Sequence, residues 1–440
     1  MATRRIEALP RDDATNGWAN ILPARHPTPP LEGAVMCDWV VVGAGFAGLA
    51  ATRRLAENRP HDKIVLLDAQ KMGDGASARN SGFVIDLPHN VGAELADKPA
   101  EQRVMRLSRA ASAYNAEIVA KHGIDCDWSN RGQHLAAVSP GGVAHLEAFT
   151  RELDALGEPY RMLDRRQTAA ALGTEYYRAA VHTPGTVLMQ PAALVRGLAD
   201  TMPENVTLHE QSPVTAIDYG ERIRLETPGG SVDAASIILA INGFAPQFGH
   251  YRRRIFSIRA YASLTRPLTA DEQAALGGEH DWGILPTNAF AAPTMRYTRD
   301  NRLLFRQNMS YASRLYTDPA GHEAVRRAHI PLFRARFPML PEVTFEHTWV
   351  GYLCLSRNFA PGFGQHAPNV FTAVCQNAMG ATKGTVSGML VADLACGVDN
   401  PLIADMEAFG QPERLPPRPF LDIGAWANMA WRVWQGRAER

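Results

Sequence analysis

Three glycines near the amino end of the chain have the spacing of a loop that binds a dinucleotide. Gly43, Gly45 and Gly48 follow a short apolar run at 38–42 and open a helix-like segment at 46–57. The first glycine permits a tight turn, the second lets the backbone approach a pyrophosphate, and the third lets the helix pack closely on the strand. The first helical turn offers N–H groups to phosphate oxygens. The residues expected at the phosphates are Gly43, Gly45, Phe46, Ala47 and Gly48.

An acidic residue ends the next expected strand. The apolar run 63–68 closes on Asp68, about twenty positions after the third glycine, which completes a strand–loop–helix–strand–acid unit. A carboxylate at this place accepts hydrogen bonds from both ribose hydroxyls and disfavours a 2′-phosphate. The unit therefore predicts NAD or FAD rather than NADP, and by itself it does not separate the two.

A polar loop after the acid favours FAD over NAD. The segment 70–84, QKMGDGASARNSGFV, is rich in Gly, Ala and Ser and lacks periodicity, and Arg79 adds positive charge. Its alternative interpretation is an ordinary surface loop, but long loops without regular structure are uncommon unless they have a function. Further cofactor contacts are expected at Ala69, Gln70, Gly75, Ala76, Ser77, Arg79, Asn80, Ser81 and Gly82.

The composition is typical of a globular protein with two domains. The chain has 440 residues, which exceeds one ordinary core. Lys+Arg and Asp+Glu both number 45, and no basic stripe of a nucleic-acid binder is present. The five scattered cysteines lack metal-ligand spacing and indicate reduced thiols. No segment has the apolar length of a signal peptide or a membrane span. We therefore expect a cytoplasmic protein without a nucleic-acid partner, a membrane span or a metal site.

The opening unit resembles that of the D-amino-acid-oxidase-type FAD-dependent oxidoreductases. This family includes glycine oxidase-like and sarcosine oxidase-like members, and the sequence pattern here is most similar to that of the gamma-glutamylputrescine oxidase-like members. The family often shows GASGRNGG where this chain has GASARNSG, and segments 183–200, 235–248 and 347–397 are also similar. The resemblance implies bound FAD. Some relatives link the flavin covalently through Cys or His, but Trp349 stands near one such position and Cys354 is offset from it. We therefore expect non-covalent FAD.

The resemblance and the pattern of elements together predict an α/β (α+β) fold. We expect a Rossmann-like FAD-binding domain of the glutathione-reductase type. It is interleaved with a substrate domain whose antiparallel sheet covers the flavin. The expected divisions are an extended leader at 1–36, a discontinuous FAD-binding domain at 37–95, 180–250 and 345–400, a substrate-binding or cap domain at 96–179 and 251–344, and a tail at 401–440. Further helices are expected at 100–121, 141–156, 191–202 and 319–335, and further strands at 133–138, 206–209, 213–218, 221–226, 236–241, 253–266, 290–297, 302–308 and 369–375.

The implied chemistry is removal of a hydride from a carbon that bears nitrogen, with transfer to flavin N5 and hydrolysis of the resulting imine. Lys383 and His347 are the candidate catalytic residues. Lys383 stands at a helix start and could stabilise negative charge on the flavin or bind a substrate carboxylate. His347 could tune the protonation of the amine. Lys383 pointing into water and His347 being structural are the alternatives. The remaining cofactor candidates are Val214, Asn242, Gly243, Gly380, Ala381, Thr382 and Lys383. The substrate candidates, on strands or loops that should face the flavin, are Tyr261, Arg306, Trp349 and Tyr352, and Tyr311 is a further one.

Three classes of function stay open. The first is an FAD-dependent oxidase or dehydrogenase of an amine or amino acid, gamma-glutamylputrescine oxidase-like, with oxygen or another carrier as acceptor. The second is an FAD-dependent 2-hydroxy-acid dehydrogenase or a monooxygenase, and the third is a non-catalytic FAD-binding subunit. The tail PRPFLDIGAWANMAWRVWQGRAER has a Trp-rich apolar side and basic residues. Docking of this tail on the protein, on a second copy or on a partner subunit is favoured over an interfacial membrane helix.

Overall fold

Apolar β-branched runs form a mixed sheet that carries the glycine loop. The computed structural model describes residues 3–88, 98–316 and 320–440. From one edge, this first sheet runs through β1 (Arg4–Arg5), β10 (Ala216–Asp218), β11 (Ile223–Glu226), β12 (Gly230–Leu239), β2 (Gly33–Val42), β3 (Ile64–Leu67) and β9 (Val206–His209), and β19 (Val370–Val374) and β18 (Gly362–Ala367) join it beside β12. The strands β12, β2, β3 and β9 are parallel to one another, whereas β12 pairs with β11 in the antiparallel sense. Parallel strands buried on both faces are continuous apolar runs, as VVV and IVLL are.

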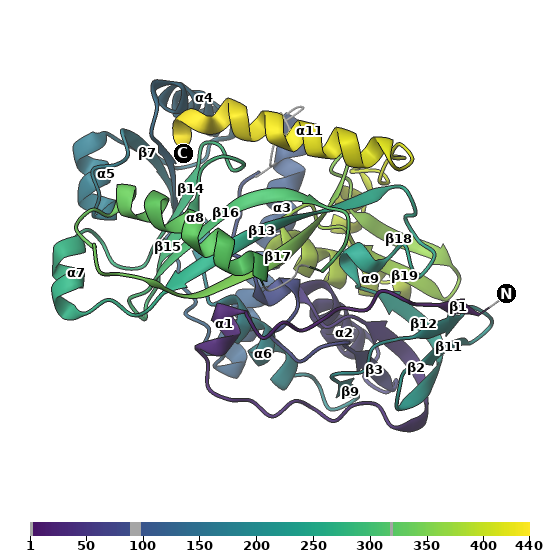
Figure 1. The fold of residues 1–440 in the computed structure, drawn as a ribbon. Helices are drawn as coiled ribbons and strands as arrows, with labels where there is room; N and C mark the ends of the chain where they lie inside the picture. Colours follow the sequence, from purple (N-terminus) through teal and green to yellow (C-terminus); the bar gives the residue numbers. More distant parts are fainter. Residues whose placement is uncertain (1–2, 89–97, 317–319) are drawn as a thin grey trace.

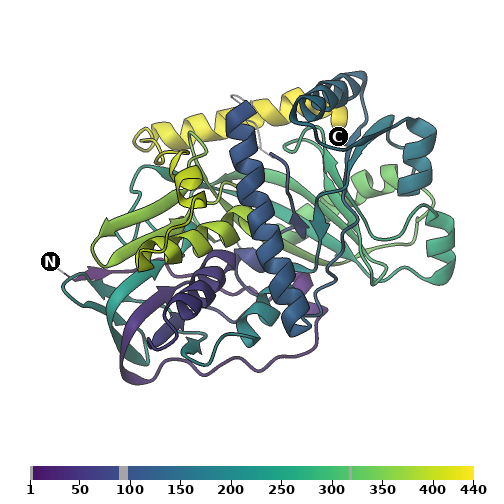
Figure 2. The same cartoon turned by 180° about the vertical axis from the view of Figure 1, so that it is seen from behind.

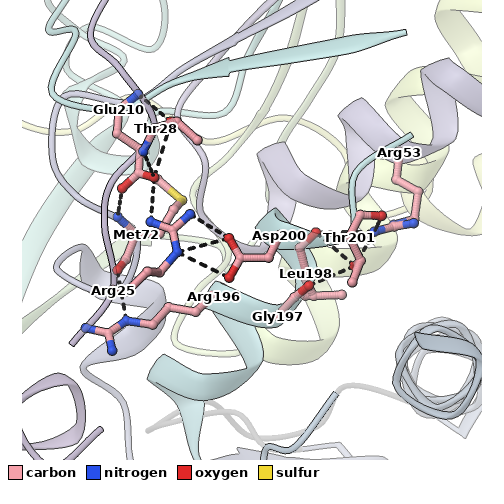
Figure 3. Close-up of polar contacts among 10 residues, drawn as sticks. All are labelled: Arg25, Thr28, Arg53, Met72, Arg196, Gly197, Leu198, Asp200, Thr201 and Glu210. Atoms are coloured by element: carbon pink, nitrogen blue, oxygen red, sulfur yellow. Dashed lines mark hydrogen bonds and ion pairs between the residues drawn. The ribbon is translucent and has the colours of Figure 1, made fainter. Parts of the chain in front are cut away.

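Helices cover the first sheet and are tied to one another (Figures 1 and 2). They are α2 (Phe46–Asn58), α3 (Lys98–His122), α6 (Pro191–Asp200), α9 (Thr385–Cys396) and α10 (Leu402–Glu407). A Cβ atom on Gly388 of α9 would lie 2.0 Å from the carbonyl oxygen of Ala47, so glycine lets α9 and α2 touch. The Arg53 guanidinium of α2 donates to the carbonyl oxygens of Leu198 and Thr201, at 3.2 and 2.7 Å, at the end of α6 (Figure 3). A cation at this place interacts favourably with the negative end of the α6 dipole.

The second sheet is antiparallel except for one pair, and it lies beside the first (Figure 1). Its order is β17 (Phe345–Ser356), β13 (Ile255–Thr265), β16 (Leu303–Ala312), β15 (Thr294–Tyr297), β14 (Trp282–Pro286), β5 (Gln133–Ala137), β7 (Ala179–Thr183) and β6 (Arg161–Leu163), with β14 and β5 parallel. The helices of this part are α4 (Pro140–Leu156), α5 (Arg165–Leu172), α7 (Ala270–Leu276), α8 (Ala320–Arg336) and α11 (Phe420–Gln435). The fold class predicted from the sequence is confirmed.

The structure differs from the expected elements in places where periodicity is weak. β17 pairs along its whole length with β13 of the second sheet, although it lies in the range expected for the FAD-binding domain. The strand expected at 290–297 is confined to Thr294–Tyr297, and β14, whose sequence WGILP is buried throughout and does not alternate, was not expected. The expected domain boundary between 95 and 96 lies outside the described residues.

The leader is not simply extended. It contains β1, which pairs with β10, and the short helix α1 (Gly17–Asn20), whose Trp18 is buried. The other short elements are β4 (Phe83–Val84) paired with β8 (Val187–Leu188), 3₁₀ turns at Ala76–Ala78, Asn242–Phe244 and Gly436–Glu439, and a π-helical turn at Gly380–Gly384. No helix of the described residues is long and apolar enough to cross a bilayer.

Candidate functional site

A cavity of about 380 Å³ is lined by elements of both sheets. It brings together most of the cofactor residues expected from the sequence. Those that line it are Gly43, Gly45, Phe46, Ala47, Asp68, Ala69, Gln70, Gly75, Ala76, Ser77, Arg79, Asn80, Ser81, Val214, Asn242, Gly243, Gly380, Ala381 and Thr382. Gly48, Gly82 and Lys383 lie outside the lining.

The glycine loop has the backbone geometry that its spacing requires. Gly43 has φ 96°, which favours glycine. A Cβ atom on Gly48 would lie 1.6 Å from the carbonyl oxygen of Gly43, so only glycine lets the start of α2 approach β2. No side-chain cap closes the first turn of α2, although the N–H of Phe46 donates to Oγ of Ser77 at 3.0 Å. The helix start therefore offers N–H groups and a partial positive charge to an anionic group in the cavity.

Asp68 is oriented by the backbone at the end of β3. Its Oδ2 accepts the N–H of Ala44 at 2.6 Å, and its Oδ1 accepts the N–H of Gln70 at 2.8 Å. Burial raises the pKa of Asp68 to about 6. Each carboxylate oxygen keeps a lone pair for a further donor, so the side chain can still accept the two hydroxyls of a ribose.

Replacing Asp68 with Asn should weaken FAD binding about tenfold or more, because an amide nitrogen would replace one of the two acceptor oxygens. The measurement is the FAD dissociation constant of the reconstituted apoprotein. Asp38→Asn is the matched control, because Asp38 also accepts a backbone N–H, that of Lys63 at 2.8 Å, but does not line the cavity. Equal affinities of the two variants would contradict the ribose role of Asp68.

The loop after Asp68 is fixed from outside by a buried carboxylate (Figure 3). Glu210 is fully buried and accepts the N–H of Met72 at 2.7 Å and the N–H of Thr28 at 2.9 Å. Its charge is paired with Arg25 at 2.6 Å, and Arg25 also pairs with Asp200 of α6 at 2.6 Å. The leader and α6 thus hold the loop in one place beside the cavity.

Leader residues also set the orientation of Arg79, which was expected to add positive charge for phosphates. Its guanidinium is paired with Asp13 at 2.8 Å and donates to the carbonyl oxygen of Val350 at 3.2 Å. The indole N–H of Trp18 donates to the carbonyl oxygen of Asn80 at 2.8 Å. Arg79 therefore helps to fix the loop, and its charge is largely balanced by a partner that the sequence did not reveal.

Gln376 is a cavity residue that the sequence analysis missed. It is 8% exposed, and neither its amide nitrogen nor its amide oxygen has a hydrogen-bond partner among the described residues. Buried amides without partners are uncommon in proteins, and such a group in a cavity indicates a polar ligand. The nearby π-helical turn, Gly380–Gly384, also has no side-chain cap. The glycine loop, Asp68 and this unpaired amide together fit a flavin dinucleotide.

Lys383 lies at the start of α9 but is turned away from the cavity lining. It is 3% exposed, and its ammonium group is 4.8 Å from the ring centroid of Phe409. Burial lowers its pKa to about 8. The alternative that Lys383 points into water is therefore wrong, and its contact is with an aromatic ring.

The burial of Lys383 predicts a pH-dependent stability difference. The neutral lysine is favoured in the folded chain, so the wild type should gain up to about 3 kcal/mol of unfolding free energy relative to Lys383→Met as pH rises from about 8 to 10.5. Urea unfolding of both proteins across this range measures the difference. Parallel stability curves would contradict the buried position. Flavin reduction rates of the same variant test its expected catalytic role.

Among the cavity residues on the second sheet, Arg306 presents a cation without a carboxylate partner in the described part of the chain. It lies on β16, and its Nη2 donates to Oγ1 of Thr294 on β15 at 2.8 Å, while Nη1 is 3.1 Å from Sδ of Met309. Burial lowers its pKa to about 10, so the group is still charged at neutral pH. Tyr352 of β17, in the same sheet, also lines the cavity. A planar guanidinium of this kind is suited to bind a carboxylate.

The structure places the other expected substrate and catalytic residues away from the cavity lining. Trp349 is buried, donates its indole N–H to the carbonyl oxygen of Arg79 at 3.1 Å and packs on Trp18. Tyr261 is buried in edge contact with His322. His347 lies 3.7 Å from Glu346, and burial lowers its pKa. In addition, the hydroxyl of Tyr311 donates to Asp422 at 2.5 Å. Successive residues of a strand face opposite sides, so a nearby sequence position does not guarantee a cavity contact.

The fold and the residues that line the cavity fit a redox enzyme of the flavin-dependent class. The family model described as FAD dependent oxidoreductase (DAO) matches residues 38–394, and the chain belongs to this family. The enzyme is therefore an FAD-dependent oxidoreductase, as the sequence predicted.

Relatives of known name agree with this assignment. The chain is 27% identical to a probable oxidoreductase OrdL of Rhizobium meliloti, over 86% of this chain and 87% of that protein. It is 26% identical to the gamma-glutamylputrescine oxidoreductase of Escherichia coli, over 89% of each chain. Among solved structures, glycine oxidase from Geobacillus kaustophilus superposes with a TM-score of 0.71 at 18% identity, over 87% of this chain and 100% of that chain. The last comparison supports the fold.

Proposed function

We propose that this FAD-dependent enzyme oxidises a C–N bond of a small amine or amino acid that carries a carboxylate. The observation that carries the proposal is Arg306, a charged guanidinium on the cavity wall with no carboxylate partner in the described chain. The two compounds in the names of the relatives, gamma-glutamylputrescine and glycine, each contain an amine and a carboxylate. A substrate of this chemistry pairs with Arg306 and presents its amine to the rest of the cavity.

Each part of the cavity has a role in this proposal. The glycine loop and Asp68 hold the dinucleotide, and Gln376 pairs with a polar edge of the cofactor. Bound FAD supplies the acceptor for the hydride that leaves the carbon bearing nitrogen. Arg306 and Thr294 orient the substrate carboxylate, which fixes the reacting carbon. The product imine hydrolyses in water.

We also propose that the FAD is held without a covalent bond. Cys354 lines the cavity, but contact with the thiol of Cys375 and burial raise its pKa well above the ordinary value. A protonated thiol is a poor nucleophile for attachment to the flavin. The five cysteines are all free, which fits a reducing, cytoplasmic compartment.

Anaerobic mixing of the holoenzyme with matched compounds tests the function. Amino acids and other carboxylate-bearing amines should bleach the oxidised flavin band, whereas 2-hydroxy acids of the same carbon skeleton should not. Bleaching by 2-hydroxy acids alone would identify a hydroxy-acid dehydrogenase, because Arg306 would bind their carboxylate equally well. Bleaching by NAD(P)H without an amine would identify a monooxygenase, and no bleaching by any compound would favour a non-catalytic subunit.

A further inference from the structure

The C-terminal helix α11 presents an apolar aromatic face to the outside. It runs along one edge of the molecule, outside the two sheets, in both views (Figures 1 and 2). Five large apolar side chains on it are between 53% and 69% exposed, namely Phe420, Ile423, Trp426, Trp431 and Trp434. At 100° per residue these side chains cover an arc of about 140°. Within this arc α11 otherwise has only Ala427 and Ala430.

The opposite side of α11 is firmly attached to the body of the protein. Met429 packs in a core cluster with Met309 and Leu355. Near the start of the helix, Asp422 accepts the hydroxyl of Tyr311 at 2.5 Å. Just after its end, the Glu439 carboxylate accepts the backbone N–H of Val138 at 2.8 Å. The helix therefore cannot rotate to bury its aromatic face, and that face is a fixed part of the surface.

The charges around this face are mainly positive. Arg418 stands before the helix, 3.4 Å from Asp422, and Arg437 and Arg440 stand just after its end, while the chain as a whole has a net charge of zero. Arg432 lies on the other side of the helix, where its guanidinium is 5.2 Å from the ring centroid of Phe290. The two acids of this region, Asp422 and Glu439, are already engaged in the contacts that attach the helix. The guanidinium of Arg437 lies 4.3 Å from the ring centroid of Trp434, so the cation and the aromatic face are adjacent.

We propose that α11 is an interfacial helix that binds the surface of an anionic lipid bilayer, which replaces the protein docking favoured from the sequence because the aromatic face is exposed. Tryptophan and phenylalanine favour the boundary between headgroups and acyl chains, and arginines at both ends of the face suit anionic headgroups. The helix lies on the membrane and does not cross it. A second copy of the chain fits the face less well. In an antiparallel pair of α11 helices Arg418 would approach Arg437 and Arg440, and in a parallel pair each arginine would approach its own copy.

Vesicle flotation of the full-length holoenzyme tests the proposal. We expect binding to phosphatidylcholine vesicles that contain phosphatidylglycerol, much weaker binding to phosphatidylcholine alone, and loss of binding at high salt. Trp426→Ser should lower partition to the anionic vesicles about tenfold. Met36→Ser is the matched control, because Met36 is 67% exposed on β2, and it should bind as the wild type does. Unchanged FAD content shows that each variant is folded.

Two results would overturn the proposal. One is absence of flotation with either lipid, or equal flotation of the Trp426 and Met36 variants. The other is a concentration-dependent dimer in solution that Trp426→Ser abolishes, which would make the aromatic face a contact between copies of this chain. Tryptophan emission should also shift to shorter wavelength on adding anionic vesicles, and the shift should be smaller in Trp426→Ser.

Discussion

Replacing Arg306 with Met should lower kcat/KM for a carboxylate-bearing amine about a hundredfold or more. The substrate carboxylate would lose a charge-assisted, paired contact in a partly buried place, and losses of this kind cost about 2–5 kcal/mol. The effect should appear mainly in KM, because the carboxylate is bound in both the ground state and the transition state. Steady-state kinetics and anaerobic flavin reduction measure it.

Two controls separate this role of Arg306 from a structural one. The decarboxylated analogue of the same substrate should react with wild type and Arg306→Met at similar rates, because it has no group for the guanidinium to bind. Arg306→Lys should recover part of the affinity, since it keeps the charge but loses the planar fork. Equal losses for the carboxylated and decarboxylated compounds would contradict carboxylate binding at Arg306.

Replacing Gly48 with Ala should remove FAD and destabilise the protein by about 3 kcal/mol. The added methyl group would lie 1.6 Å from the carbonyl oxygen of Gly43, which is backbone and cannot turn aside. The start of α2 must therefore move away from β2, and the N–H groups at the phosphate position move with it. Flavin content after purification and urea unfolding measure the two effects.

Gly424→Ala is the matched control for this prediction. Gly424 lies inside α11, and a Cβ atom there would meet nothing within 4 Å. The change should stabilise the helix by about 0.5–1 kcal/mol and leave FAD content unchanged. If Gly48→Ala keeps its flavin and behaves like Gly424→Ala, the close approach of α2 to β2 is not needed for the cofactor.

The strand–loop–helix–strand–acid unit around Gly43 was predictable from the sequence because its constraints are local. The apolar run before Gly43, the helix that starts near Phe46 and the acid at Asp68 are close in the chain, and each follows from strand, helix or turn chemistry. β17 is different, because its place beside β13 depends on pairing between residues that are 80 to 101 positions apart in the chain. Periodicity within one segment carries no information about such a partner.

The site was only partly predictable for the same reason. Gln376 follows the buried strand β19 and has no motif of its own, so its unpaired amide becomes visible only when the cavity is known. The ion pair of Arg79 with Asp13 joins the loop to the leader, which the sequence predicts only as an extended segment. Trp349 was expected near the substrate, but its side chain supports the loop from the core instead.

The most direct test of the account is the flavin content of the purified full-length protein. We expect a yellow protein with about one FAD per chain, and we expect heat or acid precipitation to release the flavin into the supernatant as intact FAD. A colourless protein that does not take up added FAD would contradict the cofactor site at Gly43 and Asp68. Flavin that stays with the precipitate would contradict non-covalent binding.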